Sequence, residues 1–489
     1  MRFSLLLFSI FIVLVPATRY VPVNSSTEAR ELSVAWEISE TGNWLTPSRN
    51  GVTVSKPPLY HWILAASGFE ITPGLGRSLN VLAALGILLL LYLYQSKNIS
   101  LTALILFSTH GFLNSAMDAR VDMTAAFFVT ASIVAIVKSK KFLAPLAIGL
   151  SILAKGPVSF ILSVAGGFFL GGQKIILTAL FGLIIGSLWY GTLLIYGESS
   201  TLERQIIFEN LQRFFGGADV NSEPWYYYIK DLARKAFPWS FVLLISFLKP
   251  FGVSTRERNF FLFGLLFFSV ASGKRFSYLV PLFPWFALYL SNYLTEGWRR
   301  LSDLSKSRII KLSEVLFVAG VTILIVSVPA IELFSLPLSL DSPSVHIAFV
   351  WLESVRYKIG ASVLLGVLSS YLLRSDKIGR FLPIAISFWI LFAWSAEGVK
   401  GAIKDFDRAA VEINKIVGSE PLVVVKEKQD ELFDPIIFNL KRRVTVSQKI
   451  ASGFILSREP VCDVLGVFEQ IADKEKLRTD RRIYLSKCD

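Results

Sequence analysis

The sequence is poor in cysteine, histidine and charge. Its 489 residues contain two cysteines and three histidines, which excludes a metal site built from four cysteines. Charged residues make up 18% of the chain, whereas an average soluble domain has roughly 25%. Hydrophobic residues make up 53%, so burial inside one soluble core does not explain the composition. The composition indicates an integral membrane protein.

Long apolar runs recur along the chain, and residues 175–196 and 276–295 are two of them. An apolar run of about 20 residues is long enough to cross a bilayer as a helix. We therefore expect an α-helical polytopic membrane protein with about 13 transmembrane helices, counted by hydropathy and length. The predicted spans lie near 3–17, 76–95, 101–117, 122–137, 142–154, 157–172, 175–196, 237–248, 259–272, 276–295, 312–332, 359–373 and 381–396. The first run has the length of a signal-peptide core, but a first transmembrane helix fits better because no clear cleavage site follows.

The positive charges orient these spans. The net charge of +13 does not indicate nucleic-acid binding, because lysine and arginine gather between the apolar runs, where they set topology. With the N-terminus inside the cytoplasm, most short loops rich in cations face the cytoplasm. Two long polar loops, 18–75 and 197–236, then face outward. We expect residues 1–396 to form the transmembrane domain and residues 397–489 an extracytoplasmic C-terminal domain.

The C-terminal segment resembles a soluble domain. PLVVV (421–425) is strand-like, DELFDPIIFNL is helix-like, and RRVTV is strand-like again. The pattern predicts a small α/β domain. Cys462 and Cys488 both lie in this segment, and a disulfide between them is one possibility if the segment is outside the cytoplasm.

A few cations lie where the topology does not favour them, at the outer ends of apolar segments. They are Lys56, in SKPPLYHW, and Arg120, Lys155, Lys274 and Arg275 in short outer loops. An anionic ligand at the outer membrane surface explains such positions. The alternative is that these side chains reach the phosphates of ordinary membrane lipids.

Two acidic residues on the same, predicted outward-facing side are candidate functional residues. Asp122 opens the apolar helix 122–137, and an acid at the mouth of a membrane helix is a candidate functional residue. Glu28 lies near the start of a predicted interfacial helix over 25–44. Favourable interaction with a helix N-terminus is the alternative explanation for both acids.

Five motifs, in this order and each at an outer boundary, resemble one family. They are TEAR–ETGNWLTP–NGV–KPPLYHW, ARVDMTAAFF, LAKGP, ENLQRFFGG–PWYYY–PW and SGKRFSYLVPLFP. The chain resembles GT-C glycosyltransferases of the aminoarabinose transferase and protein O-mannosyltransferase group. The resemblance implies transfer of a sugar from a polyprenyl-phosphate donor to an extracytoplasmic lipid or glycan acceptor, at the inner membrane of a prokaryote. It also implies an extracytoplasmic C-terminal domain.

The resemblance assigns roles to residues of this chain. Residues expected to bind the donor phosphate are Lys56, Lys155, Lys274, Arg275 and Arg213. Residues expected to contact substrate are Arg30, Asn210, Asn221, Tyr226, Tyr227 and Tyr278. Asp122 or Glu28 is expected to act as the catalytic base or to orient the acceptor.

Three positions depart from the family pattern. Thr27 stands where an Asp often precedes Glu28, Ser55 replaces an acid before Lys56, and Asn221 replaces a histidine. Loss of both ligand types at positions 55 and 221 predicts that the protein uses no metal or other cofactor. The expected partners are the lipid-linked sugar, the acceptor and membrane lipids, without nucleic acid, and we expect a monomer.

Two other functions fit some of these features. A transporter or flippase of lipid-linked sugars would show inverted repeats and ionisable groups near mid-membrane, whereas here the charges gather at one face. A non-catalytic relative that only binds polyprenyl lipid would explain the departures from the family pattern.

Overall fold

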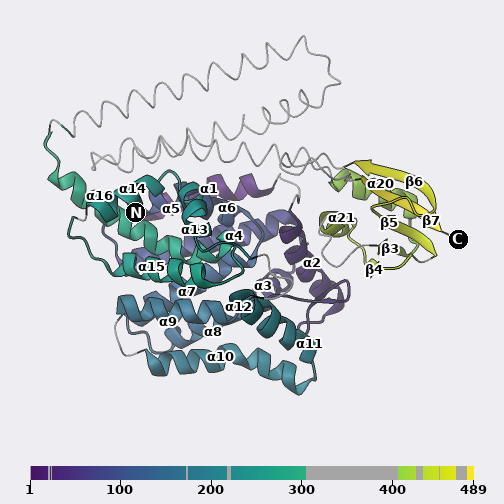
Figure 1. The fold of residues 1–489 in the computed structure, drawn as a ribbon, viewed down its shortest axis with the longest axis horizontal. Helices are drawn as coiled ribbons and strands as arrows, with labels where there is room; N and C mark the ends of the chain where they lie inside the picture. The colour runs from purple at the N-terminus through teal and green to yellow at the C-terminus, as the bar shows by residue number, and fades with distance from the viewer. Residues whose placement is uncertain are drawn as a thin grey trace, which may run out of the picture.

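The computed structural model describes residues 2–19, 23, 25–171, 175–216, 222–249, 251–303, 305, 406–425, 433–450, 452–469 and 482–488. In these ranges a large helical body carries a small α/β unit at one end (Figure 1). The predicted spans 312–332, 359–373 and 381–396 lie outside the described residues.

The helices up to residue 300 follow the predicted spans closely. They are α1 (Arg2–Arg19), α4 (Pro73–Tyr94), α5 (Ile99–Ser108), α6 (His110–Met117), α7 (Val121–Val137), α8 (Leu143–Lys155), α9 (Pro157–Gly171), α10 (Ile176–Ile195), α14 (Ser240–Leu248), α15 (Arg256–Val270) and α16 (Phe283–Arg300). In the described part of the chain, α4 and α10 are long and apolar enough to cross a membrane, and α5 with α6, bent by 75°, is a third candidate. The full number of spans stays a prediction.

Helix α7 lies at the centre of the helical body. It packs against α4, α8 and α9, and its side chains Met123, Ala126 and Val129 are fully buried. Helix α8 in turn packs on α10, where Gly182 and Gly186 face Ile148 and Ile152 so closely that a Cβ atom would approach to 2.5 Å. Small residues at such contacts let helices pack tightly in a membrane, where van der Waals contact replaces the hydrophobic effect.

The turn between α8 and α9 fixes the position of Lys155. Gly156 has φ +80°, a conformation that glycine adopts without steric cost, and it ends α8. Pro157 then begins α9, as proline commonly does at the first helical position. Lys155 is therefore held at the last residue of α8, beside the first turn of α7.

The two long loops, which we call the first and second outer loops after their predicted orientation, form their own short elements. The first contains α2 (Ser26–Thr41), the hairpin of β1 (Ser48–Arg49) and β2 (Val52–Thr53), and α3 (Leu59–Ala66). The second contains α11 (Ser199–Leu202), the π-helical η1 (Glu203–Gln212), α12 (Arg213–Phe215) and α13 (Tyr227–Lys235), and a 3-10 helix, η2 (Phe276–Leu282), precedes α16.

Helix α2 confirms the helix predicted over 25–44. Ser25 caps its start, because the Glu28 backbone N–H donates to Ser25 Oγ at 3.1 Å. The apolar residues Leu32 and Ala35 of α2 are fully buried, because α3 and the C-terminal helix α21 (Phe433–Leu440) pack against α2. The helix is therefore buried on this face by protein.

The C-terminal unit is an α/β fold. It contains α20 (Phe406–Val417), β3 (Leu422–Val425), α21 (Phe433–Leu440), β4 (Thr445–Ser447), β5 (Gly453–Ser457), β6 (Asp463–Glu469) and β7 (Arg482–Cys488). The strand order is β4-β3-β5-β7-β6, with β3 parallel to β4 and β5, and β7 antiparallel to its neighbours. The three segments predicted as strand, helix and strand appear as β3, α21 and β4. Cys462 and Cys488 form a disulfide with a Cα–Cα distance of 5.3 Å.

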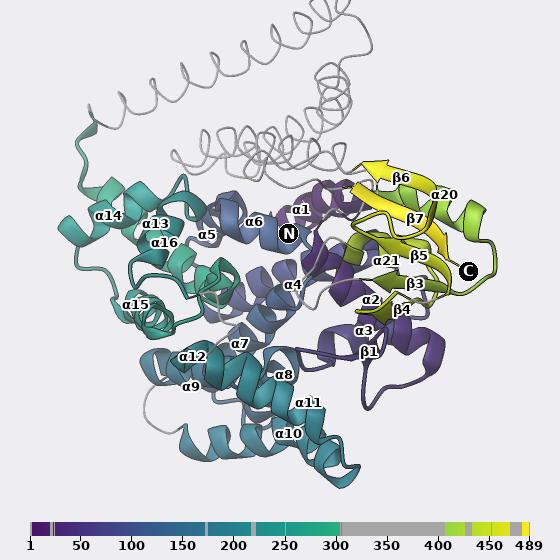
Figure 2. The same ribbon diagram turned by 45° about the vertical axis from the view of Figure 1, so that its right-hand side comes forward.

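This unit lies beside α2 and the β1–β2 hairpin (Figure 2). Phe438 of α21 joins an apolar cluster that includes Leu32 of α2 and Tyr60 of α3. Lys441 extends the contact, because its Nζ donates to the Ile71 carbonyl at 2.6 Å. The C-terminal unit is thus packed on the first outer loop.

Candidate active site

Asp122 and Lys155 form a buried ion pair between the start of α7 and the end of α8. Lys155 Nζ donates to Asp122 Oδ1, and Arg120 Nη2 lies 3.2 Å from Asp122 Oδ2. The side chains of Asp122 and Lys155 are 6% and 7% exposed. A buried charge is strongly unfavourable unless it is paired, so each carboxylate oxygen faces a cation. The pair joins α7 to α8 through two residues that are 33 positions apart in the sequence.

Tyr278 of η2 connects this pair to the second outer loop. Lys155 Nζ donates to the Ser277 carbonyl at 3.2 Å and lies 5.1 Å from the centroid of the Tyr278 ring. On its other side the Tyr278 hydroxyl accepts a hydrogen bond of 3.3 Å from Arg213 Nη1. The start of the segment 276–300 is thereby fixed against α8 and α12.

Lys56 has its acidic partner in the second loop. Its Nζ donates to Glu209 Oε2 at 2.9 Å, and Arg213 Nη2 donates to Glu209 Oε1 at 3.2 Å. The backbone around Lys56 is also held, because Gln205 Nε2 donates to the Lys56 carbonyl at 3.0 Å. Position 55, directly before Lys56, has no acid. Lys56 instead pairs with Glu209, which is 153 residues further along the chain.

These contacts form one connected group, which we call the outer charge network. Its members are Lys56, Arg120, Asp122, Lys155, Glu209, Arg213 and Tyr278. The network holds four cations and two carboxylates, so positive charge is in excess. A cluster of this kind, at helix ends and partly open, is suited to binding a phosphate.

Glu209 is held in its ionised form by this network. Burial alone would raise the pKa of the Glu209 carboxyl, but Lys56 and Arg213 outweigh that effect and the pKa is lowered. The carboxylate therefore stays charged at neutral pH and offsets part of the positive charge of Lys56 and Arg213.

Glu28 lies in a separate buried ion pair. Its oxygens accept from Arg77 Nε at 2.7 Å and from Arg77 Nη2 at 2.6 Å, and the Ala119 backbone N–H donates to Oε1 at 2.9 Å. Glu28 is 2% exposed. These contacts tie α2 to α4 and to the turn before α7, so the structure brings Asp122 rather than Glu28 into the outer charge network.

The remaining predicted donor-phosphate residues lie next to η2. Lys274 Nζ donates to the carbonyls of Glu223 at 2.7 Å and Ala271 at 2.5 Å, which ties it to the backbone of the second loop. The Arg275 side chain is exposed, and its carbonyl accepts from the Tyr228 hydroxyl at 3.1 Å. Both residues precede Tyr278 closely, and their partners are outside the outer charge network.

The predicted substrate residues are spread more widely. Asn210 Nδ2 donates to the Gln205 carbonyl within η1 at 2.5 Å, and Arg30 pairs with Asp434 of the C-terminal unit at 3.9 Å. Tyr226 is 51% exposed and Tyr227 begins α13. Asn221 lies outside the described residues.

The sequence did not reveal Glu209, and it placed Arg120 among the cations that an anionic ligand would explain but not among the residues assigned to the site. Glu209 and Arg213 have the i, i+4 spacing of a helical ion pair, which was a usable signal. A third missed feature is the contact of 2.7 Å between His61 Nε2 and Glu31 Oε2, which joins α3 to α2. Long-range pairs of this kind leave no trace in the spacing of residues.

A metal site was not expected. Within the described ranges, no group of three or more His, Cys, Asp or Glu side chains is placed to hold a metal ion. Ser55, at the position that departs from the family pattern, lies next to Lys56 in the first outer loop.

The fold and the network together define a class of protein, an integral membrane protein with a cationic cluster at one end of its helices. No protein-family profile matches the chain. The chain is similar to undecaprenyl phosphate-alpha-4-amino-4-deoxy-L-arabinose arabinosyl transferase 1 of Pseudomonas fluorescens, at 25% identity over 426 residues, which cover 78% of this chain and 74% of the relative. It is also similar to the transferase of the same name from Pectobacterium atrosepticum, at 25% identity over 352 residues, covering 62% and 61%. An uncharacterized protein of Aquifex aeolicus is 26% identical over 338 residues, which cover 62% of this chain and 66% of that protein.

Solved structures agree on the fold. The crystal structure of ArnT from Cupriavidus metallidurans bound to undecaprenyl phosphate matches with a TM-score of 0.72 at 15% identity, covering 99% of this chain and 97% of that one. The apo structure of the same protein gives a TM-score of 0.73. The predicted resemblance to the aminoarabinose transferase group is confirmed, and the protein has the GT-C membrane fold.

The network predicts how stability depends on pH. The pKa of Glu209 is lower in the folded protein than its ordinary value of about 4.3, so the unfolded chain takes up the proton first. The stabilisation by Glu209 is fully present above about pH 5 and is lost as the pH falls through the lowered pKa. We expect Glu209→Gln to lower the unfolding temperature of the detergent-solubilised protein at pH 7, and the difference from wild type to shrink towards pH 3.5.

The exposed Glu203→Gln, in the same loop segment, is the matched control and should show no such difference. A Glu209→Gln penalty that stays constant over the whole pH range would contradict the assigned ion pairs.

Proposed function

We propose that this protein transfers a sugar from a polyprenyl-phosphate donor to a lipid or glycan acceptor at the extracytoplasmic side of the inner membrane. The observation that carries the proposal is the positive excess of the outer charge network. The named relatives act with undecaprenyl phosphate-linked 4-amino-4-deoxy-L-arabinose, so this is the first donor to test.

The donor phosphate is proposed to bind between the two long loops. Lys56 and Arg213 are 22% and 28% exposed at their side chains, so they can exchange Glu209 for a phosphate. Lys155 lies behind them across the Tyr278 ring. As the bond between the anomeric carbon and the phosphate oxygen breaks, these cations stabilise the negative charge that stays on the polyprenyl phosphate. Lys274 and Arg275 add positive charge to the same boundary.

Asp122 is proposed to act on the acceptor. A carboxylate paired with both Lys155 and Arg120 accepts a proton poorly. When the donor phosphate draws Lys155 towards itself, Asp122 becomes free to take the proton of an acceptor hydroxyl as that oxygen attacks the anomeric carbon. If the attacking group is itself a phosphate, no proton has to move, and Asp122 then serves to hold Lys155 and Arg120.

The transporter alternative is less well supported by the same geometry. The network is built from helix ends and loop residues, whereas transporters place their ionisable groups near the middle of the membrane. A non-catalytic lipid-binding relative is not favoured either, because the network retains both a phosphate-binding cluster and a carboxylate.

Lys56→Ala should weaken the binding of undecaprenyl phosphate on the order of ten-fold, because a charge-assisted hydrogen bond contributes about 1.5–3 kcal/mol. Binding is measured by native mass spectrometry of the full chain in detergent. Lys97→Ala removes an exposed cation from the loop between α4 and α5 and is the matched control. Equal effects of both substitutions would show that Lys56 contacts ordinary membrane lipids and not the donor phosphate.

Asp122→Asn should lower turnover on the order of 100-fold, the usual contribution of a positioned acid or base, while donor binding is retained. Turnover is measured by transfer of radiolabelled sugar from the donor lipid. Asp118→Asn, four residues earlier, is the control. Turnover near the wild-type rate in Asp122→Asn would show that Asp122 has no role in the transfer step.

The reaction is proposed to need no metal, because Ser55 and Asn221 stand where a ligand pair is expected and neither is a good ligand for a transition metal. Treatment with EDTA should leave the transfer rate unchanged, and so should the addition of excess Zn²⁺ or Mg²⁺. Strong inhibition by EDTA, reversed by a metal, would overturn this part of the proposal.

A further inference from the structure

The turn directly before α7 is held by side chains from two other helices. Asn80 of α4 donates from Nδ2 to the Asp118 carbonyl and, at 2.7 Å, to the Arg120 carbonyl. Between these two contacts, the Ala119 backbone N–H donates to Glu28 Oε1 of α2 at 2.9 Å. The turn that carries Arg120 is therefore bound through its backbone at three successive residues.

Asn80 also contacts the first turn of α7. Thr124 Oγ1 donates to Asn80 Oδ1 at 3.4 Å, and Asn80 and Thr124 are 0% and 3% exposed. A buried carboxamide is unfavourable unless its polar atoms have hydrogen-bond partners, and here both the amide nitrogen and the amide oxygen have them. Asp122 lies in the chain between the turn and Thr124, so the contacts of Asn80 hold the backbone on both sides of Asp122.

The close approach of α4 to this turn depends on Gly76. A Cβ atom at Gly76 would lie 2.7 Å from Ala119 Cβ and 2.8 Å from Leu32 Cδ2. Gly76 and Asn80 are four residues apart and therefore lie on the same face of α4. This face combines a residue without a side chain, which lets the turn approach, with a carboxamide that binds the turn.

Gln205 makes the same kind of contact with the backbone around Lys56. Its Nε2 donates to the Lys56 carbonyl at 3.0 Å and to the Val54 carbonyl at 3.4 Å. These two carbonyls are two residues apart, as are the two that Asn80 binds. Gln205 is 1% exposed and belongs to η1, so a buried carboxamide of the second outer loop holds the backbone of the first.

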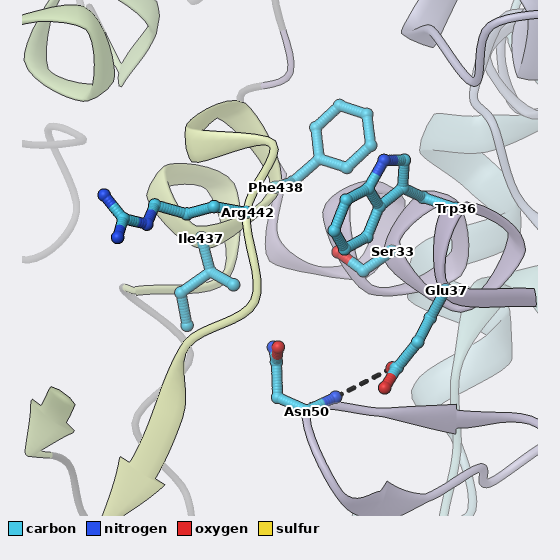
Figure 3. A pocket seen from close by; sticks show the side chains of 7 residues that line it. All are labelled: Ser33, Trp36, Glu37, Asn50, Ile437, Phe438 and Arg442. Atoms are coloured by element: carbon cyan, nitrogen blue, oxygen red, sulfur yellow. Dashed lines mark hydrogen bonds between the residues drawn. The ribbon is translucent and has the colours of Figure 1, made fainter. Parts of the chain in front are cut away.

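The start of the segment that leads to Lys56 is fixed by α2. The Asn50 backbone N–H donates to Glu37 Oε2 at 2.8 Å (Figure 3), and the Ser48 hydroxyl donates to Glu37 Oε1 at 3.3 Å. Asn50 lies in the turn between β1 and β2. The chain from this hairpin to Lys56 is thus held by Glu37 at one end and by Gln205 at the other.

We propose that Asn80 and Gln205 are positioning residues for two different steps of the reaction. Asn80 sets the position of Asp122 and of its partner Arg120, and so acts on the transfer step. Gln205 sets the position of Lys56, and so acts on the binding of the donor phosphate. The inference rests on the proposed function and deepens it, because it assigns the two parts of the outer charge network to separate steps. A displacement of about 1 Å can lower a rate on the order of 100-fold, so a small movement of either segment is measurable.

The test measures turnover and donor binding of the full chain in lipid nanodiscs. Asn80→Ala should lower turnover at saturating donor about ten-fold or more and change the affinity for undecaprenyl phosphate by less than about two-fold. Gln205→Ala should weaken that affinity about five-fold and leave turnover at saturating donor within about two-fold of wild type. Asn80→Asp keeps the size of the side chain, but its carboxylate does not donate to the two carbonyls, so it should behave as Asn80→Ala does.

Asn292→Ala is the matched control. Asn292 of α16 is also a carboxamide between helices, and its Oδ1 accepts from Gln95 Nε2 at 2.9 Å and from Asn98 Nδ2 at 3.2 Å, beyond the other end of α4. Its loss should leave both turnover and affinity near the wild-type values. Hydrogen exchange is measured on the same proteins, and amide exchange should become faster over residues 118–124 in Asn80→Ala and over residues 53–56 in Gln205→Ala.

The separation of the two effects is a result that a general loss of stability does not produce. Equal losses of turnover and affinity in Asn80→Ala and Gln205→Ala, or losses no larger than those of Asn292→Ala, would overturn the assignment, and so would unchanged hydrogen exchange. Failure of the wild type to bind undecaprenyl phosphate would instead overturn the proposed function. The exchange rates would then still decide whether the two carboxamides hold their segments.

Discussion

The ion pair between Asp122 and Lys155 holds the outer ends of α7 and α8 together. Because both side chains are almost fully buried, each needs an opposite charge beside it. Asp122 also pairs with Arg120, and Lys155 can exchange Asp122 only for another anion. Lys155 also bonds the Ser277 carbonyl and lies over Tyr278, which fixes η2 against the same helix ends. The positions of Arg213 and Glu209 follow from Tyr278, and that of Lys56 follows from Glu209. One buried pair thus sets the geometry of the whole cationic cluster.

The cluster explains how two loops that are far apart in the sequence act as one site. Lys56 belongs to the first loop and Glu209 to the second, and the bond of 2.9 Å between their side chains joins the two loops. In the proposed mechanism, an incoming phosphate competes with Glu209 for Lys56 and with Asp122 for Lys155.

Much of the fold follows from local pattern. Apolar length predicts the helices that include α4, α7 and α10, and the strand-like run PLVVV predicts β3. The site was harder to predict. Lys56 and Lys155 were identified because they are cations at predicted outer boundaries. Glu209 was not identified, because its pairing with Lys56 arises only from tertiary contact. The family motifs include Glu28 as well as Asp122, but a motif does not reveal the partners of an acid, and in the structure Glu28 pairs with Arg77. The three spans predicted between 312 and 396 are outside the described residues and remain predictions.

The central claim is that the outer charge network is the donor-phosphate site. The most direct measurement is a cryo-EM map of the full chain in a lipid nanodisc with bound undecaprenyl phosphate. The account predicts density for the phosphate within about 3 Å of Lys56 Nζ or the Arg213 guanidinium, the distance of a charge-assisted hydrogen bond, with Glu209 turned away from both. A phosphate bound elsewhere, with the bonds from Lys56 and Arg213 to Glu209 intact, would contradict it.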